Sequence, residues 1–304
     1  MYNRRQFLKG GALATLGSLT MSKNAAAFFA EKHAIGLQLY TLFNVIDTDV
    51  EGTLKKVAAI GFTELESAFS RIGGYYGKTP KEFAALTKSL GLSWKSHHVL
   101  GAPFKLPPGA KMPSGPDGKP IKFPVVKNLK ENMQQLVDEA AEGGIKYLVC
   151  ASIPITTGDE VKEAVEILTK TGEAAKKAGV TFCYHNHDRE FVEKDGKRAY
   201  DTFLEIPADL MKFELDLAWV TKAKVDPLEL FKKHPGRFPL VHCKDFSADF
   251  KTLEPVGQGV VDFKRIFSAA KTAGIEHYFV EHDMPKDPFA SITTSYAALR
   301  KLGL

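Results

Sequence analysis

The sequence contains few cysteines and no long apolar segment beyond its N-terminal region. Cys150, Cys183 and Cys243 are the three cysteines of the 304 residues, and each lies in or at the end of an apolar run. An odd number of cysteines at such positions argues against a disulfide framework and indicates small core side chains. No window of about 20 apolar residues follows the N-terminal region, which excludes a membrane span in the rest of the chain.

Acidic residues are absent from the first 27 residues, which have the features of a targeting signal. The segment 3–9 reads NRRQFLK, a weakly apolar stretch covers residues 10–21, and three alanines follow at 25–27. This order resembles a twin-arginine export signal, although Asn3 stands where that signal usually has Ser or Thr. We expect the twin-arginine translocase as a partner and a periplasmic or otherwise exported chain. Cleavage after residue 27 and an uncleaved anchor are alternatives.

The positive charge of the chain is concentrated in this N-terminal segment. Arg4, Arg5, Lys9 and Lys23 precede the predicted cleavage point, and their removal lowers the formal net charge from +5 to +1. A mature charge this close to zero argues against a nucleic-acid partner. The twin-arginine route carries folded proteins, so a cofactor could be acquired before export.

A unit made of a short apolar strand, a polar tip, an amphipathic helix and a glycine recurs from residue 34 onward. The predicted strands are 34–40, 62–65, 93–96, 147–151, 181–184, 211–215, 239–241 and 278–280. The predicted helices are 50–60, 80–90, 125–142, 159–178, 200–206, 227–233, 263–273 and 288–302. Glycine follows five of these helices, at Gly61, Gly91, Gly144, Gly179 and Gly274, and takes the left-handed cap conformation cheaply.

Eight strands alternating with eight helices predict parallel βα units that close into a (β/α)8 TIM barrel over residues 28–304. A doubly wound open sheet is the alternative, but no glycine-rich phosphate loop follows the first strand, where Gly36 stands alone. The segment 102–124 after the third strand is rich in Pro, Gly and Lys and predicts a lid over the C-terminal mouth. Tyr75 and Tyr76 are expected to face a substrate at the same rim.

Polar side chains gather where the predicted strands end. In a βα barrel, catalytic groups lie at the C-terminal ends of the strands and in the loops that follow. These positions hold Gln38, Tyr40, Glu66, His97, His98, Ser152, His185, His187, Asp216, His242, Lys244, Asp245, Glu281, His282 and Asp283. His97 and His98 are adjacent and point to opposite sides of their strand, so at most one of them faces the mouth.

One residue from each of the last four strands could bind a metal. Asp216 and Glu281 end apolar strands, where an ionised carboxylate is costly to bury without a partner. His185 and His242 complete a ring of four ligands. Mixed nitrogen and oxygen ligands suit one divalent ion, Mn²⁺, Co²⁺, Zn²⁺ or Fe²⁺, and leave open positions for substrate oxygens.

The strand-end motifs resemble those of the sugar phosphate isomerase/epimerase family, which has the xylose isomerase-like barrel. The motifs are YHNH at 184–187, ELD at 214–216 with Trp219, LVHCKD at 240–245 and VEHD at 280–283. The resemblance covers about residues 34–304 and implies metal ligands at His185, Asp216, His242 and Glu281. His185 departs from the family pattern, because many relatives have there a Glu that also serves as one of two acid/base groups in the epimerases.

The resemblance also implies roles for residues beside the ligands. Members that dehydrate a ring use a His and a Lys at the positions of His187 and Lys244. A divalent metal that chelates a carbonyl and a neighbouring hydroxyl acidifies the carbon between them. We expect His187 to remove that proton and Lys244 to donate to an oxyanion or leaving group. The remaining assignments are Glu281 as a catalytic group as well as a ligand, and Glu66, His98 and Trp219 as substrate-binding residues.

Three functions follow as hypotheses. The first is a metal-dependent isomerase or epimerase that acts on a keto-sugar through an enediolate. The second is a lyase that cleaves 3-keto-glycosides by β-elimination, and the third, from another class, is a non-catalytic periplasmic sugar-binding barrel. Export argues against a phosphorylated sugar, and the mature charge argues against the DNA cleavage known in a sister group. The expected partner is therefore a small-molecule sugar or glycoside.

Overall fold

A computed structural model describes residues 28, 32–103, 126–194 and 196–304. The predicted export signal at 1–27 and nearly all of the predicted lid lie outside these residues, so both stay predictions. Among the described residues, no helix combines the length and the apolar character needed to cross a membrane.

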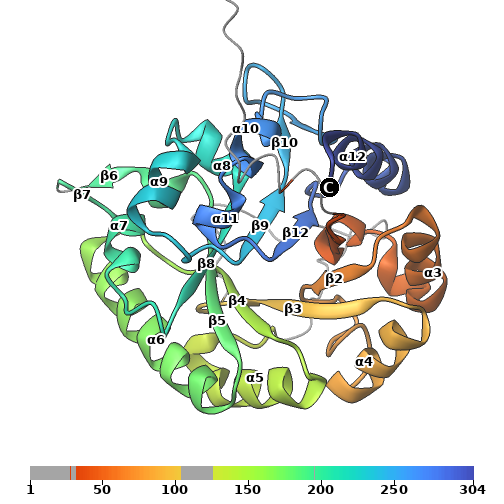
Figure 1. The fold of residues 1–304 in the computed structure, drawn as a ribbon. Helices are drawn as coiled ribbons and strands as arrows, with labels where there is room; N and C mark the ends of the chain where they lie inside the picture. The colour runs from red at the N-terminus through yellow and green to blue at the C-terminus, as the bar shows by residue number, and fades with distance from the viewer. Residues whose placement is uncertain (1–27, 29–31, 104–125, 195) are drawn as a thin grey trace, which may run out of the picture.

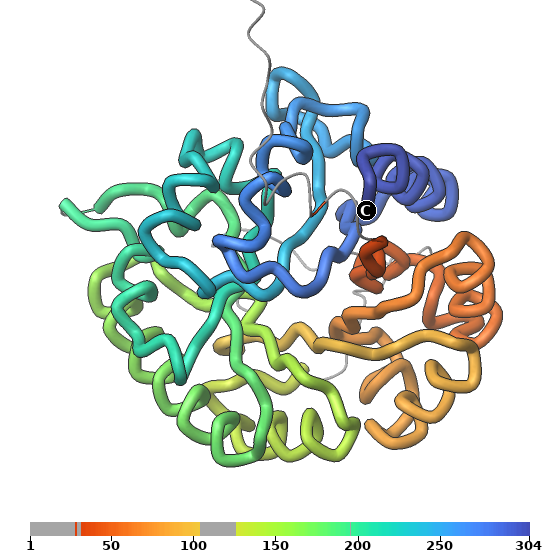
Figure 2. Tube along the Cα trace, in the orientation of Figure 1, coloured from red at the N-terminus to blue at the C-terminus, as the bar shows by residue number. Residues whose placement is uncertain are grey.

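Eight parallel strands close into a barrel, as Figure 1 shows. In their order around the barrel they are β1 (Ile35–Gln38), β2 (Glu64–Ser67), β3 (Ser93–Leu100), β4 (Tyr147–Ser152), β5 (Thr181–His185), β8 (Lys212–Asp216), β9 (Leu240–Cys243) and β12 (His277–Val280). The pairing of β1 with β12 closes the ring, and in Figure 2 the red first and blue last strand segments lie side by side. The predicted (β/α)8 barrel is confirmed and the open sheet is excluded.

Helices cover the outside of the barrel. They are α3 (Val50–Ile60), α4 (Pro80–Ser89), α5 (Leu129–Gly143), α6 (Gly158–Lys177), α7 (Ala199–Leu204), α8 (Leu217–Lys222), α9 (Pro227–Lys233), α10 (Phe263–Phe267), α11 (Ala270–Ala273) and α12 (Pro288–Leu302). The single helix predicted over 263–273 is two short helices, and the prediction missed α8. Helix α5 begins later than predicted because the side chain of Asn128 caps it by accepting a hydrogen bond from the backbone N–H of Glu131, at 3.1 Å.

Short elements complete the loops around the barrel. The two-stranded ribbons are β6 (Glu193–Lys194) with β7 (Lys197–Arg198) and β10 (Asp245–Phe246) with β11 (Leu253–Glu254). The 3-10 helices are η1 (Leu39–Leu42), η2 (Ile46–Thr48) and η3 (Arg189–Phe191). The predicted first strand is therefore too long, because its last two residues belong to η1.

The five predicted glycine caps all adopt the left-handed conformation. Their φ angles are 118°, 74°, 67°, 74° and 79° at Gly61, Gly91, Gly144, Gly179 and Gly274. A side chain is strained in this region, whereas glycine is not. These residues end the helices and return the chain to the next strand, which confirms the repeat inferred from the sequence.

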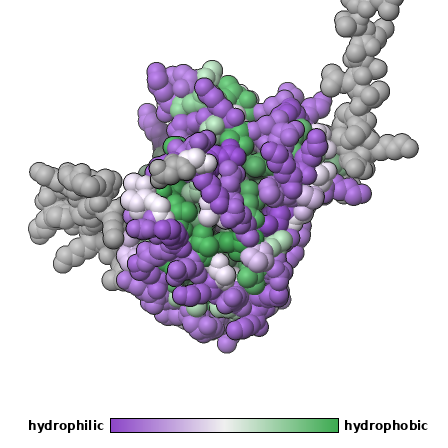
Figure 3. Space-filling view, turned by 90° about the vertical axis from the view of Figure 1, so that its left-hand side faces the viewer, coloured by the Kyte–Doolittle hydropathy of each residue, from purple (hydrophilic) through white to green (hydrophobic). Residues whose placement is uncertain are grey.

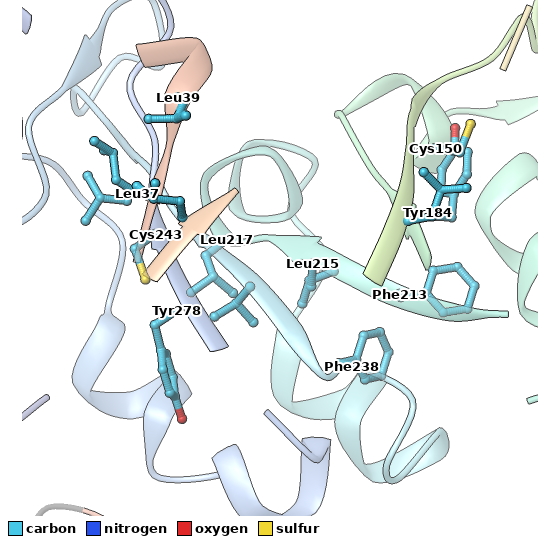
Figure 4. Close-up of a cluster of buried hydrophobic side chains, with 14 of the residues drawn as sticks. Leu37, Leu39, Cys150, Tyr184, Phe213, Leu215, Leu217, Phe238, Cys243 and Tyr278 are labelled. Carbon is cyan, nitrogen blue, oxygen red and sulfur yellow. The ribbon is translucent and has the colours of Figure 1, made fainter. Parts of the chain in front are cut away.

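Apolar side chains pack both outside and inside the barrel wall. Figure 4 shows part of the outer core, in which Cys150 and Cys243 lie among buried leucine and aromatic side chains. A smaller cluster fills the barrel interior: Tyr147, Val149, Cys183, Leu240 and Phe279. All three cysteines are free and buried, as predicted. The face drawn in Figure 3 is mostly hydrophilic, with hydrophobic side chains showing mainly in its central part.

Gly36 explains how the barrel interior accommodates its largest apolar ring. A Cβ atom at this position would lie 2.3 Å from the ring of Phe279. The glycine therefore leaves room for Phe279 inside the barrel. Its role is packing, and no phosphate loop surrounds it.

The prediction that Tyr75 and Tyr76 face a substrate is wrong. Tyr75 and Tyr76 are only 4% and 3% exposed. The Tyr76 hydroxyl accepts a hydrogen bond from the backbone N–H of Ala68 at 3.1 Å, and the Tyr75 hydroxyl donates to Glu139 at 3.3 Å. Their rings pack edge-on or tilted against Trp94 and Phe83, so both tyrosines anchor the loop after β2 to the outer core.

Candidate metal centre

The strands place alternate side chains inside the barrel, and these side chains build the site. Along β8, Glu214 and Asp216 share a face because side chains of a strand alternate. Asp216 pairs in register with His242 on β9, and Glu214 pairs with His185 on β5. Glu281 follows the last residue of β12 directly.

The four predicted ligands meet at the C-terminal end of the barrel. His185, Asp216, His242 and Glu281 are all buried, and each offers a ligand atom within 4.8 Å of the other three. The Nδ1 atom of His242 lies 2.7 Å from Glu281 Oε2 and 3.9 Å from Asp216 Oδ2. The four residues thus form a compact group of two imidazoles and two carboxylates, which we call the outer ligand group.

Asp216 supplies a test of whether a cation fits this group. Its Oδ1 atom caps α8 by accepting hydrogen bonds from the backbone N–H groups of Ala218 and Trp219, both at 2.9 Å. Its Oδ2 atom is buried and accepts no hydrogen bond from any described residue, although Lys244 Nζ lies 3.3 Å away. Burial raises the pKa of Asp216 to about 6 against the opposing influence of Lys244. A cation beside Oδ2 would offset this cost, so the residues fit a divalent metal.

Glu214 lies beneath the outer ligand group and was not among the predicted site residues. It is fully buried, and its Oε2 atom lies 2.6 Å from His98 Nε2, 3.0 Å from His185 Nδ1 and 3.1 Å from His242 Nε2. A carboxylate that holds the far nitrogen of a ligand histidine fixes its tautomer and orientation. The sequence signal was available, because Glu214 stands two residues before Asp216 and must share its face.

Glu66 completes this deeper layer. Gln38 donates a hydrogen bond to its Oε1 at 2.8 Å, and Ser96 donates one to its Oε2. His242 Nε2 lies 2.6 Å from Glu66 Oε1 and His98 Nε2 lies 3.2 Å from the same atom. Glu66 is fully buried and does not line the cavity described below. Its carboxylate therefore contacts the neighbouring protein side chains, including His98 and His242. Its predicted contact with a substrate has no support from this placement.

His98 faces the interior and His97 does not, as the strand alternation predicted. The ring of His97 lies outside the barrel, with Nδ1 2.7 Å from the hydroxyl of Ser67. Burial lowers the pKa of His98, but Glu66 and Glu214 outweigh it and raise this pKa to about 10. His98 also joins His185, Glu214 and His242 in a second, deeper group of metal-capable atoms. We favour the outer group as the metal site, because it contains the Asp216 oxygen that accepts no hydrogen bond from any described residue, and because it contains the cavity-lining Glu281.

A cavity of about 360 Å³ opens above the outer ligand group. Its polar lining includes His98, Ser152, His185, His187, Lys244, Glu281 and Asp283. Its apolar lining includes Tyr40, Ala68, Phe69, Val99, Leu100, Ala151 and Met284. A volume of this size is within the range of small-molecule sites.

His187 lines this cavity and has a ring nitrogen that is unpartnered in the described part of the chain. Its Nδ1 atom is buried and has no hydrogen-bond partner among the described residues. Its backbone N–H donates to Glu190 at 2.8 Å, which fixes the chain here, and its ring centroid lies 5.1 Å from that of His185. Burial lowers the pKa of His187 well below its usual range, and His185 and Lys244 add to this effect. The imidazole is therefore neutral at pH 7 and able to accept a proton.

Lys244 is held by three carboxylates. Its Nζ atom lies 2.7 Å from Glu281 Oε2, 3.1 Å from both oxygens of Asp283 and 3.3 Å from Asp216 Oδ2. Burial lowers the pKa of Lys244, but Asp216, Asp283 and Glu281 outweigh it and raise the pKa well above its usual value. The ammonium group therefore stays charged beside the cavity, as a proton donor or a partner for a developing negative charge requires.

Trp219 lies next to this region. Its ring centroid is 5.6 Å from that of His187, and Lys244 Nζ lies 5.6 Å from the ring centroid. The indole nitrogen is buried and has no hydrogen-bond partner among the described residues. Trp219 does not line the cavity itself, so its predicted contact with a substrate stays a prediction.

Two of the strand-end residues hold loops instead of facing the cavity. Both carboxylate oxygens of Asp245 accept backbone N–H groups, those of Gly257 and Gly259 at Oδ2 and those of Phe246 and Val261 at Oδ1, all at 3.0 Å. Asp245 therefore holds the segment 256–262, which contains Gly257 and Gly259, against the end of β9. His282 Nδ1 lies 2.9 Å from the hydroxyl of Ser291 on α12.

The closed eight-stranded barrel with metal-capable residues at its C-terminal end defines a class of βα-barrel proteins. The family model of the xylose isomerase-like TIM barrel matches residues 54–302. The chain belongs to this family.

Solved structures agree with this assignment. The structure of a sugar phosphate isomerase/epimerase from Parabacteroides distasonis ATCC 8503 is 29% identical, covers 89% of this chain and 94% of its own, and has a TM-score of 0.70. The IOLI protein with a bound zinc atom covers 88% of this chain and 97% of its own, at 13% identity and a TM-score of 0.63. At that identity the second likeness shows the fold alone.

Sequence relatives of known activity match a shorter region. An inosose dehydratase of Geobacillus thermodenitrificans (strain NG80-2) is 27% identical over 163 residues, which are 47% of this chain and 53% of the relative. An inosose dehydratase of Lacticaseibacillus casei is 24% identical over 165 residues, 49% of this chain and 55% of the relative. The matched region thus spans about half the length of these relatives.

Proposed function

We propose that the protein is a metal-dependent carbohydrate enzyme that removes a proton from the carbon beside a ketone. One observation carries the proposal: His187 and Lys244 line the same cavity as His185 and Glu281 of the outer ligand group. A base, a proton donor and a site for a Lewis acid are the parts that enolisation needs.

The metal would be held by His185, Asp216, His242 and Glu281. A bound divalent ion would polarise the ketone and acidify the neighbouring C–H bond. The mixed nitrogen and oxygen ligands admit Mn²⁺, Co²⁺, Zn²⁺ or Fe²⁺. The buried Oδ2 atom of Asp216, which accepts no hydrogen bond from any described residue, supports this assignment.

The favoured reaction is β-elimination from a 3-keto-glycoside. His187 takes the proton from carbon 2, and the electron pair of that bond forms a double bond between carbons 1 and 2. The bond from carbon 1 to the glycosidic oxygen breaks, and this oxygen takes a proton from Lys244. After the product leaves, His187 releases its proton to water and Lys244 takes a proton back from water, so both groups return to their starting states. No oxidant or reductant takes part.

Two observations favour elimination over two-base epimerisation. His185 stands where the epimerases have a carboxylate base, and Glu214 occupies its Nδ1 atom at 3.0 Å. The sequence relatives are named inosose dehydratases, and dehydration is also an elimination beside a ketone. Isomerisation or epimerisation of a keto-sugar is the second candidate, supported by the 29% identical structure, which is named a sugar phosphate isomerase/epimerase. The predicted export favours a substrate without phosphate in either case.

The two reactions are distinguished by what leaves the substrate. The metal-loaded protein is incubated in D₂O with a 3-keto-glucoside and separately with free keto-sugars. Elimination predicts release of the alcohol and an unsaturated keto-sugar, whereas isomerisation predicts deuterium in an intact sugar isomer. Sugar binding that survives metal removal, without turnover of any substrate, would instead indicate the non-catalytic barrel and contradict the proposal.

Replacing Glu214 with glutamine is expected to weaken metal binding about 10- to 100-fold, because the ligand histidines lose the carboxylate that orients them. The dissociation constant of the metal is measured by calorimetric titration of the metal-free protein with Zn²⁺ or Mn²⁺. The matched control is Glu64→Gln, which alters a buried carboxylate 2.7 Å from His277 Nδ1 at the other end of the barrel. Equal metal affinities in the two variants would contradict the role of Glu214.

A further inference from the structure

The cavity has an apolar lining as well as the polar one that holds the proposed catalytic groups. Tyr40 follows β1, Phe69 follows β2, and Val99 and Leu100 end β3, so most of this apolar lining comes from the first three barrel strands. Met284 extends it from the loop after β12, the strand that pairs with β1. The residues Tyr40, Phe69, Val99, Leu100 and Met284 are called the apolar wall below.

Neighbouring contacts hold the aromatic part of the wall in place. The ring centroids of Tyr40 and Phe69 are 5.9 Å apart, and Phe43 packs against both, at 5.3 Å and 5.4 Å. The guanidinium group of Arg71 lies 5.0 Å from the Phe43 centroid and is paired with Asp47. Such spacing is that of stacked or tilted aromatic pairs, so the wall is preformed.

Met284 is displayed at the rim by an uncommon backbone conformation. Its φ angle is 44°, a region that residues other than glycine rarely adopt, and its side chain is 49% exposed. Two contacts fix the loop on which it stands: the backbone N–H of His282 donates to the hydroxyl of Thr41, at 3.1 Å, and Asp283 pairs with Lys244. Met284 lines the same cavity as the rings of Tyr40 and Phe69, and a flexible thioether suits contact with a flat apolar group.

The wall adjoins the position where a leaving group would depart. Lys244, the proposed donor to the glycosidic oxygen, is paired with Asp283, the residue before Met284. Tyr40 lines the same cavity as Lys244 and Asp283. The Tyr40 hydroxyl is the one polar side-chain group of the apolar wall, and a second sugar ring would need many more hydrogen-bonding partners.

We propose that the apolar wall is a binding subsite for the aromatic aglycone of a glycoside. This inference rests on the proposed elimination, in which the aglycone is the leaving group, and it names the substrate class. Stacking on Phe69 and Tyr40 would place the aglycone oxygen within reach of Lys244. Glycosides of a phenol would then be preferred to glycosides of a small alkyl alcohol.

Equilibrium binding tests the subsite without requiring turnover. We expect the metal-loaded wild-type protein to bind unoxidised 4-nitrophenyl glucoside about tenfold more tightly than methyl glucoside. One aromatic contact supplies enough binding free energy for a difference of this size. Phe69→Ala should remove most of this preference, and Phe69→Leu, which keeps an apolar side chain, should remove part of it. The control is Ile72→Ala, which truncates an exposed side chain outside the cavity and should keep the wild-type ratio.

Kinetics separates this inference from the proposed reaction. Both the 4-nitrophenyl and methyl 3-keto-glucosides are assayed, and the ratio of their kcat/KM values is expected to fall about tenfold in Phe69→Ala. Absence of cleavage with both substrates would refute the elimination, while an aryl preference in binding would still support the subsite. Equal binding of the aryl and methyl glucosides, or an unchanged preference in Phe69→Ala, overturns the subsite whatever the reaction.

Discussion

Asp216→Asn is expected to abolish tight binding of a divalent metal while leaving the fold intact. Asparagine caps a helix as well as aspartate does, so its side-chain oxygen can still accept the N–H groups of Ala218 and Trp219. Its amide group cannot replace the ligand oxygen Oδ2. The loss of affinity should exceed the roughly 10- to 100-fold that follows loss of a hydrogen-bond partner of a ligand. Turnover should fall by roughly a thousandfold or more, because a polarising metal supplies several kcal/mol.

Two controls separate the metal from the helix cap in this experiment. Asp226→Asn changes the N-cap of α9, where the side chain accepts a hydrogen bond of 3.0 Å from the backbone N–H of Leu228. Because this cap is not part of the outer ligand group, the variant should keep metal content and turnover. Asp216→Ala removes both the ligand and the cap, so in the presence of a chelator it should be about 1 kcal/mol less stable than Asp216→Asn. Metal content is measured by mass spectrometry after dialysis. Full metal occupancy in Asp216→Asn would show that the metal lies elsewhere.

His187→Gln is expected to lower kcat by roughly 100- to 10,000-fold, the range contributed by a positioned general base. Metal content should stay at the wild-type level, because His187 is not one of the outer ligands and its Nδ1 atom makes no hydrogen bond within the described part of the chain. Measurement of metal occupancy, kcat and KM on the same preparation separates loss of the base from loss of the metal.

His234→Gln serves as the matched control, because His234 follows α9 at the surface and its substitution should leave kcat unchanged. The rate at which the substrate exchanges its proton with D₂O gives a second measurement. It reports proton removal directly, so it should fall in a variant that lacks the base. A kcat within a few-fold of wild type in His187→Gln would assign the base to another residue.

The sequence predicted the barrel because its strongest signals are local. A glycine after a helix favours a left-handed conformation that ends the helix locally, and five of them marked the repeats. Strand ends followed from the same repeat, and parallel strands bring their ends to one face. His185, Asp216, His242 and Glu281 could therefore be grouped although almost 100 residues separate the first from the last.

Contacts that depend on barrel closure could not be predicted in the same way. Glu214 lies 2.6 Å from His98 across the barrel, and 116 residues separate the two in sequence. Strand alternation shows that both face inward, but which side chains meet depends on the register of the strands between them. The inward partners of Glu66 were unpredictable for the same reason. Tyr75 and Tyr76 were misplaced because a glycine-rich loop gives no periodicity from which to infer the direction of a side chain.

The proposed metal ligands and most of the apolar wall are encoded in different parts of the chain. All four proposed metal ligands follow residue 184, on β5 to β12, whereas the aromatic rings of the apolar wall precede residue 70. Substitutions at Tyr40 or Phe69 can thus alter which molecule is accepted. Exchange of the whole first half-barrel with that of a relative would also replace Glu66, which lies 2.6 Å from the proposed ligand His242. Single positions in the aromatic part of the wall are therefore the direct route to new substrate ranges with inherited chemistry.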